Sequence, residues 1–162
     1  MRFSSYPQYR KSSNQFLGDI PEHWEDVRLK FVSRINMGQA PGSEDCNQDG
    51  EGWPFLQGSG EFGEVSPVPK QWCVSPPKFS QKGSWLVSVR APVGDLNFSD
   101  TTYGIGRGLC SIQPRPEVLE SAFLGHLLRH SKSALESVGK GSTYSAVSAE
   151  QVGDLPITAP PA

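Results

Sequence analysis

The stretch between Lys82 and Ile112 constrains the fold of this chain most strongly. It contains two short runs of apolar and β-branched residues, at 85–89 and 109–112, and a longer polar segment separates them. Glycine, proline and aspartate bound both runs, a pattern typical of strands in a half-buried sheet with exposed loops. We therefore expect two strands that display polar side chains where they end.

The polar segment between these runs supplies the first candidate contact residues. Arg90 directly follows the first run, and Thr102, Tyr103 and Arg107 precede the second. Several glycines lie among them and would let the backbone turn sharply or come close to a partner. The segment therefore predicts a scaffold that carries a polar contact surface.

Composition favours a mixed, loop-rich fold. The chain has 162 residues, of which 17 are glycine and 14 are proline. This length suits one domain with its own core, and frequent turn formers argue against a helical bundle. We expect a mixed α/β (α+β) domain, with a loop-rich β-sheet, one main C-terminal helix and short additional helices. The polar residues 1–15 are expected to form a flexible arm, and residues 16–162 the single domain.

The main helix is expected from Glu117 to about Val138. Pro116 and an acidic first turn suit the exposed amides of a helix N-terminus, leucines recur at helical spacing, and Gly139 would end the helix. His126 and His130 stand four residues apart, a spacing found in zinc sites. The residue after His126 is leucine rather than glutamate, however, and no third ligand is evident. Ordinary helix histidines and no metal site are therefore expected.

Other segments complete the predicted fold. Residues 27–32 fit either a strand or a short helix, because their apolar positions satisfy both periodicities. Residues 38–52 are nearly all turn formers and acids, so we expect a surface loop without a calcium site. A short strand at 53–56, an extended proline-rich run at 65–77 and a final strand that begins near residue 152 follow the same logic.

The charge balance is an obstacle to nucleic-acid binding. Fifteen Lys and Arg against seventeen Asp and Glu give a formal charge of −2, whereas proteins that neutralise phosphates usually carry a basic surplus. The distribution reduces this obstacle, because acids gather in residues 44–64 and cations in residues 70–107. One face of the domain could therefore be basic although the whole chain is not.

Cysteine usage and hydropathy indicate neither a secreted protein nor a membrane protein. Cys46, Cys73 and Cys110 are widely separated and form no C-x-x-C motif. We therefore expect three buried thiols rather than disulfides or a zinc site. The chain opens with no charged and apolar leader and contains no long apolar run. The expected compartment is the cytoplasm, with no membrane partner.

No familiar catalytic motif occurs in the sequence. The chain lacks a G-x-S-x-G nucleophile elbow, a G-x-x-x-x-G-K-[ST] phosphate loop and the carboxylate and lysine pattern of a nuclease centre. Residues 104–108 are too short for a dinucleotide fingerprint and precede a strand rather than a helix. We therefore expect no catalytic residues, and a recognition module rather than an enzyme.

Several short motifs occur in an order that resembles one known family. They are residues 20–24 with 27–29, 38–41, 53–60, 83–95, 104–108, the helix, 141–143 and 155–161. Together they resemble the target recognition domain of the specificity (S) subunits of type I restriction-modification systems, over about residues 16–161. The resemblance implies an α/β domain that recognises one half of a split DNA sequence and catalyses no reaction itself.

The resemblance also implies partners. Such subunits bind double-stranded DNA through two recognition domains, long conserved helices dock the methyltransferase (M) subunits, and restriction (R) subunits complete the assembly. S-adenosylmethionine, ATP and Mg²⁺ would belong to those partners, and no cofactor is expected in this chain. One recognition domain is present and the conserved helix is missing after Pro161. The resemblance therefore implies a fragment or a half-sized subunit, which could self-associate.

The resemblance directs the candidate side chains toward DNA. Arg90 and Arg107 can each pair with O6 and N7 of guanine, and Gln57 can form the equivalent pair with adenine. Pairing of Arg90 with Asp95, and a turn-capping role for Arg107, remain alternatives. The remaining candidates for contacts to phosphate, sugar or bases are Ser59, Lys82, Thr102, Tyr103, Lys140, Ser142, Thr143 and Tyr144.

The sequence is also compatible with other functions. An interaction module, or a decoy that takes the place of a specificity subunit without recognising DNA, would suit the net negative charge. A recognition domain from a fused type II restriction and methylation enzyme would require catalytic motifs in a longer parent chain. An enzyme with an unrecognised site is the remaining alternative.

Overall fold

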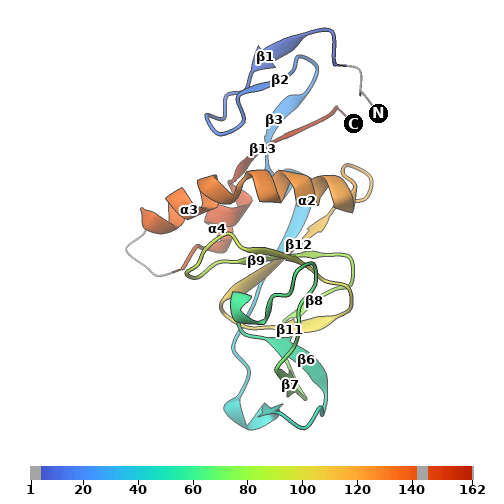
Figure 1. The fold of residues 1–162 in the computed structure, drawn as a ribbon, viewed down its shortest axis with the longest axis vertical. Helices are drawn as coiled ribbons and strands as arrows, with labels where there is room; N and C mark the ends of the chain where they lie inside the picture. Colours follow the sequence, from blue (N-terminus) through green and yellow to red (C-terminus); the bar gives the residue numbers. More distant parts are fainter. Residues whose placement is uncertain (1–4, 142–145, 162) are drawn as a thin grey trace.

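The protein consists of two β-sheets, a group of helices and two small strand pairs, stacked along its long axis (Figure 1). The computed structural model describes residues 5–141 and 146–161. Strands outnumber helices among these residues, and the predicted mixed α+β fold is confirmed. The helices are α1 (Leu29–Val32), α2 (Ser121–His130), α3 (Lys132–Lys140) and α4 (Ala149–Gly153). The strands are β1 (Tyr9–Lys11), β2 (Asp19–Pro21), β3 (Glu25–Arg28), β4 (Ser33–Met37), β5 (Cys46–Asn47), β6 (Trp53–Leu56), β7 (Gln71–Cys73), β8 (Phe79–Ser80), β9 (Trp85–Ser88), β10 (Leu96–Phe98), β11 (Tyr103–Ile105), β12 (Leu109–Pro114) and β13 (Pro156–Ala159).

The sheet with more residues, named the larger sheet, has four strands in the order β10-β9-β12-β4 and is antiparallel throughout. Its two middle strands, β9 and β12, are those that the two apolar runs predicted, and Val87 lies opposite Cys110. Helix α2 lies across one face of this sheet (Figure 1), where Leu124 and Leu128 pack into the same core as Val87 and Ile112. The helices therefore cover one face and leave the other to the smaller sheet.

The other sheet, named the smaller sheet, has five short strands in the order β5-β7-β6-β11-β8 and lies below the larger one in Figure 1. A second, smaller core joins the two sheets: Leu86 and Leu109 of the larger sheet pack with Leu56 and Ile105 of the smaller one. Strands β9 and β12 are thus buried on both faces, which explains why their sequences are continuous apolar runs. Strand β11 is parallel to β6, so the residues that follow these two strands lie at the same end of the strands.

The predicted main helix is divided in two at Ser131. The Ser131 hydroxyl donates to a carbonyl one turn back at 2.8 Å, and the backbone at this residue (φ −86°, ψ 2°) leaves the helical range. Helix α2 begins at Ser121 rather than at Glu117, because the residues before it form a turn on the carbonyl of Arg115. Helix α3 also continues through Gly139. The helical region is therefore confirmed, but its start, its continuity and its end were predicted wrongly.

The N-terminal segment that was expected to form a flexible arm contains a strand. Strand β1 pairs with β2, and the Arg10 guanidinium contacts the Asp26 carboxylate at 3.1 Å. Burial alone would raise the pKa of Asp26, but hydrogen bonds from Ser12, Ser13 and Arg10 outweigh burial and lower that pKa. The expectation of no structure is therefore wrong for Tyr9–Lys11, a strand too short and too polar to stand out in the sequence.

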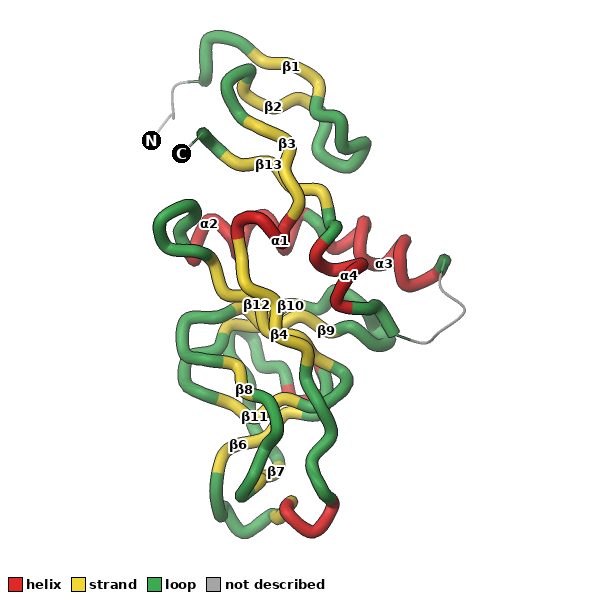
Figure 2. The backbone as a smooth tube through the Cα atoms, turned by 180° about the vertical axis from the view of Figure 1, so that it is seen from behind, coloured by secondary structure: helices red, strands yellow, loops and turns green. Residues whose placement is uncertain are grey.

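Three other segments differ in detail from their predictions. Residues 27–32 contain both alternatives, because β3 ends at Arg28 and α1 follows at once. Figure 2 shows α1 leading into β4, which runs toward the smaller sheet. The final strand is shorter than predicted, because Ala149–Gly153 form α4 and only Pro156–Ala159 form β13. The loop at 38–52 holds a 3-10 turn and the edge strand β5.

Candidate nucleic-acid interface

Three backbone segments meet where the two sheets join, and each carries one predicted contact residue. Gln57 follows β6, Arg107 lies between β11 and β12, and Arg90 follows β9. The N–H of Gly108 donates to the carbonyl of Gln57 at 3.0 Å, and the N–H of Val89 donates to the carbonyl of Gly108 at 2.9 Å. Backbone hydrogen bonds therefore fix the relative positions of Gln57, Arg90 and Arg107.

Gly108 makes this close approach possible. A methyl group at this position would lie 2.5 Å from the carbonyl oxygen of Gln57 and 3.0 Å from the Cα atom of Gly58. Both atoms belong to the backbone, so neither could move aside without displacing the segment. The glycine therefore keeps the three segments in contact.

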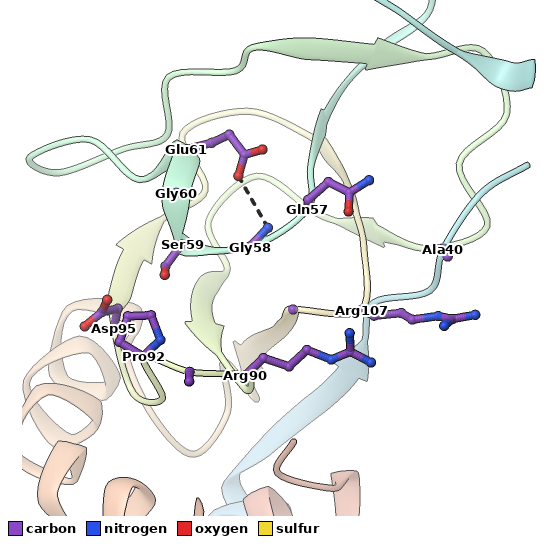
Figure 3. Close-up of a pocket in the computed structure, with 12 residues that line it drawn as sticks. Ala40, Gln57, Gly58, Ser59, Gly60, Glu61, Arg90, Pro92, Asp95 and Arg107 are labelled. Atoms are coloured by element: carbon purple, nitrogen blue, oxygen red, sulfur yellow. Dashed lines mark hydrogen bonds between the residues drawn. The ribbon is translucent and has the colours of Figure 1, made fainter. Parts of the chain in front are cut away.

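The three polar side chains line one open cavity of about 870 Å³. In Figure 3 the guanidinium groups of Arg90 and Arg107 and the amide of Gln57 point to the same side, whereas Ser59 and Asp95 lie at the other end of the cavity. All three side chains are exposed. Within residues 5–141 and 146–161, neither arginine forms a salt bridge. The guanidinium groups are therefore available to an external acceptor.

A buried serine holds the loop that carries Arg90. The Ser88 hydroxyl donates to the carbonyl of Pro92 and accepts from the N–H of Asp95 at 2.9 Å. Ser88 is 1% exposed. On its other side, Arg90 forms a β-bridge with Ala146. The loop is therefore fixed from two directions, and the sequence did not indicate this because a serine inside a strand has no characteristic pattern.

The carboxylates of the cavity have partners of their own. Asp95 accepts from the Lys132 ammonium at 2.8 Å, so the alternative pairing of Asp95 with Arg90 does not form. The hydrogen bond to the Asp95 carboxylate, together with the negative charge of that carboxylate, raises the pKa of Lys132. Glu61 accepts from the N–H of Gly58 at 3.3 Å (Figure 3). The acids in the cavity therefore do not neutralise its arginines directly.

Tyr103 belongs to the interior and not to the contact surface. It is 3% exposed in strand β11, and its hydroxyl donates to the Asp100 carboxylate. Burial, and then the hydrogen bond to Asp100, raise the pKa of Tyr103 well above its ordinary value. The prediction that Tyr103 contacts DNA is therefore wrong for this fold, because the strand that carries it is buried.

The other predicted contact residues surround the cavity or lie away from it. Lys140 and Pro92 line a second hollow, which adjoins the first because Pro92 lines both. Lys82 lines a separate hollow beside the start of α2, and Thr102 lies just before β11. Outside the described residues lie Ser142, Thr143 and Tyr144. The structure thus brings Gln57, Ser59, Arg90 and Arg107 together and places Lys140 nearby.

Metal-ligating side chains do not gather in the described part of the chain. There, no group of three His, Cys, Asp or Glu side chains could hold a metal ion. His126 and His130 are exposed on α2. Nor do residues 5–141 and 146–161 contain a helix with the length and apolar character needed to span a bilayer.

Comparison with known proteins assigns this chain to a family. Residues 21–162 match the model of the type I restriction modification DNA specificity domain. The chain belongs to this family. The resemblance found in the sequence is therefore confirmed.

Relatives of this specificity domain are longer proteins. The chain is 37% identical over 158 residues to a protein of Methanocaldococcus jannaschii provisionally named the type I restriction enzyme MjaX specificity subunit. The match covers 96% of this chain and 36% of that protein. The chain therefore spans about a third of the length of this relative.

Solved structures show the same fold. The HsdS subunit of Thermoanaerobacter tengcongensis matches with a TM-score of 0.78 and 36% identity, over 91% of this chain and 36% of that chain. A structure from work on complex assembly and conformational transition of the type I R-M system matches with a TM-score of 0.80 and 37% identity, over 91% of this chain and 37% of that one. The S subunit of M. genitalium shares the fold at 16% identity, with a TM-score of 0.64. None of these matches supports the decoy or the fused type II enzyme.

Proposed function

We propose that this specificity domain binds double-stranded DNA and recognises its sequence through Gln57, Arg90 and Arg107. The observation that carries the proposal is the backbone junction, which fixes three long polar side chains along one cavity and leaves them exposed. A guanidinium can pair with O6 and N7 of guanine, and a carboxamide with N6 and N7 of adenine. Because the backbone beneath them is already ordered, binding costs less conformational freedom.

Local charge supports this surface despite the net charge of the chain. The carboxylates of Glu61 and Asp95 are engaged with other partners, and Lys140 lines the adjoining hollow. Of the acids in residues 44–64, those near residue 45 lie at the far lower end of the molecule in Figure 1, whereas Glu61 lines the cavity. A duplex at the arginines would therefore lie away from the acids near residue 45, and Lys140 suits a phosphate contact.

Membership of the family supports a wider role. We propose that the chain acts in the cytoplasm as the non-catalytic recognition part of a type I restriction-modification system. In this role it would direct methyltransferase and restriction subunits to one half of a split target. It would do so either as one domain of a longer subunit or as a half-sized subunit that self-associates. S-adenosylmethionine, ATP and Mg²⁺ would then act in the partner subunits.

A selection from a pool of random DNA duplexes tests the proposal. We expect the wild-type chain to enrich one short motif. Arg90→Ala and Arg107→Ala should each lose preference at one base pair, equivalent to about 1–3 kcal/mol of discrimination at that position.

Arg129→Ala provides a matched control. This arginine is exposed in the last turn of α2 and does not line the cavity, so the enriched motif should be unchanged. If the wild-type chain enriches no motif, the proposal of sequence-specific recognition fails. If Arg129→Ala loses preference at a base pair as the cavity variants are expected to, the assignment of the cavity fails.

A further inference from the structure

Cys46 and Cys73 face each other at the edge of the smaller sheet. Strands β5 and β7 are antiparallel, and Cys46 is the direct partner of Cys73. In the neighbouring pair, the N–H of Val74 donates to the carbonyl of Asp45 at 3.0 Å. Hydrogen-bonded and non-hydrogen-bonded pairs alternate along an antiparallel ladder. The two cysteines therefore form a non-hydrogen-bonded pair, with both side chains on the same face.

This position has the spacing that a disulfide needs. The Cα atoms of a non-hydrogen-bonded pair lie about 4.5 Å apart, within the range of roughly 4.4–6.8 Å found in disulfides. The Cβ atoms of such pairs approach about 4.5 Å, at the upper end of the range of roughly 3.5–4.5 Å in disulfides. Strand β5 has two residues and lies at the sheet edge, so a small closing movement would suffice.

The two thiols differ in access to solvent. All three cysteines are free; Cys46 is partly exposed, whereas Cys73 and Cys110 are 0% exposed. The expectation of three buried thiols is therefore wrong for Cys46. Cys110 lies in the core beneath the helices and has no cysteine opposite it in the larger sheet. An oxidant in solution thus reaches Cys46 first, and Cys73 is the thiol placed to react next.

We propose that Cys46 and Cys73 form an intramolecular disulfide when the protein meets a peroxide. The Cys46 sulfur bonds to one peroxide oxygen as the O–O bond breaks, which gives a sulfenic acid and releases one water. The Cys73 sulfur then attacks the Cys46 sulfur, the S–S bond forms, the S–O bond breaks and a second water leaves. Both thiol protons end in the two waters, and the peroxide is the species that is reduced.

The reaction should be slow at neutral pH. Burial, and then the adjacent Cys73 thiol and the acids Asp45 and Glu44, raise the pKa of Cys46, and the thiolate is the nucleophile. The rate should therefore increase with pH. The bond would fix β5 to β7 and restrain the acidic loop at 38–52, so cleavage by a glutamate-specific protease at Glu44 should become several-fold slower.

Thiol counting and peptide mapping of the full chain test this inference. The protein is treated with hydrogen peroxide at low protein concentration, its remaining thiols are alkylated in denaturant, and the digest is examined by mass spectrometry. We expect the number of alkylated cysteines to fall from three to one. A peptide pair joined through Cys46 and Cys73 should appear, and Cys110 should be alkylated.

Single variants make the result decisive. Cys110→Ser should keep the cross-link, and Cys46→Ser, at a partly exposed position, should abolish it without loss of folding. A covalent dimer in place of the internal bond, a link through Cys110, or three alkylated cysteines after treatment would each overturn the inference. The outcome does not depend on DNA binding.

Discussion

The two sheets of this domain hold their strands in place by different means. The larger sheet has all four described helices packed into its core, which includes Leu124 and Leu128. The smaller sheet depends on the small core that it shares with the larger one. Trp53 in β6 is 45% exposed, and Val74, directly after β7, is 52% exposed. The larger sheet is therefore the better-supported part, and the smaller sheet is attached to it.

The candidate interface lies at the border between these two regions and uses both. Arg90 comes from the end of a strand in the larger sheet, Gln57 from the end of one in the smaller sheet, and Arg107 from the connection between them. The positions of these candidate contact residues therefore depend on a junction between the sheets and not on a single element. Changes in the core, in the junction and on the surface should therefore have distinct effects.

The largest effect is expected in the core of the larger sheet. Leu124→Ala should lower the free energy of unfolding by about 2–5 kcal/mol, because it leaves a cavity under the helices. Urea denaturation measures this change, and hydrogen exchange should show faster exchange in both sheets.

Leu56→Ala, in the smaller core, tests whether the two sheets differ in support. This variant should increase amide hydrogen exchange mainly in β6, β7 and β11 and leave the amides of α2 protected. Equal loss of protection in α2 from both variants would show that the two regions do not differ in support.

The next effect is expected at the junction. Gly108→Ala would place a methyl group 2.5 Å from the carbonyl of Gln57, and such overpacking costs about 1–3 kcal/mol. We expect weaker DNA binding together with this loss of stability, measured by fluorescence anisotropy with a labelled duplex and by urea denaturation.

Gly60→Ala is the matched control for the junction. Gly60 lines the same cavity, and no atom lies within 4 Å of an added Cβ. The DNA binding and the stability of the Gly60→Ala variant should therefore stay close to those of the wild type. A Gly108 variant indistinguishable from the Gly60 variant would mean that the close approach at Gly108 is not required.

A smaller and different effect is expected at Lys140. If this lysine contacts phosphate, Lys140→Ala should weaken binding to all sequences alike and reduce the slope of log affinity against log salt by about one. Titrations at several salt concentrations measure the slope. Lys11→Ala removes an exposed lysine in the N-terminal strand pair, at the opposite end of the molecule from the smaller sheet (Figure 1), and should leave the slope unchanged.

The smallest effect concerns the docking of the N-terminal strand. Since folding lowers the pKa of Asp26, its stabilising contribution is present above the ordinary value of 3.8 and is lost as the pH falls through the lowered pKa. Amide exchange of β1 at a series of acidic pH values should show this loss.

Asp26→Asn should increase exchange of β1 at neutral pH as well. Asp19→Asn, at an exposed position in β2, should not have this effect. Protection of β1 that is independent of Asp26 would show that the strand pairing alone holds the segment.

Particular residues show which parts of the site were visible in the sequence. The places of Gln57, Arg90 and Arg107 at strand ends were predictable, because each follows or precedes a short apolar run, and glycines flank Arg107 and follow Gln57. Lys132 was not, because its contact with Asp95 joins positions 37 residues apart and depends on how α3 packs. Tyr103 was misassigned because its strand lies between others, and a short strand does not reveal which neighbours cover it.

The amino-acid sequence alone was enough to indicate the family, the mixed fold and the positions of the strands that end at the candidate interface, because those depend on local pattern and turn chemistry. Only the folded structure revealed that β6 and β11 run parallel, that the helix breaks at Ser131 and that Cys46 lies opposite Cys73. These features arise from contacts between distant segments, whose energies depend on packing in three dimensions and leave no periodic pattern in the chain.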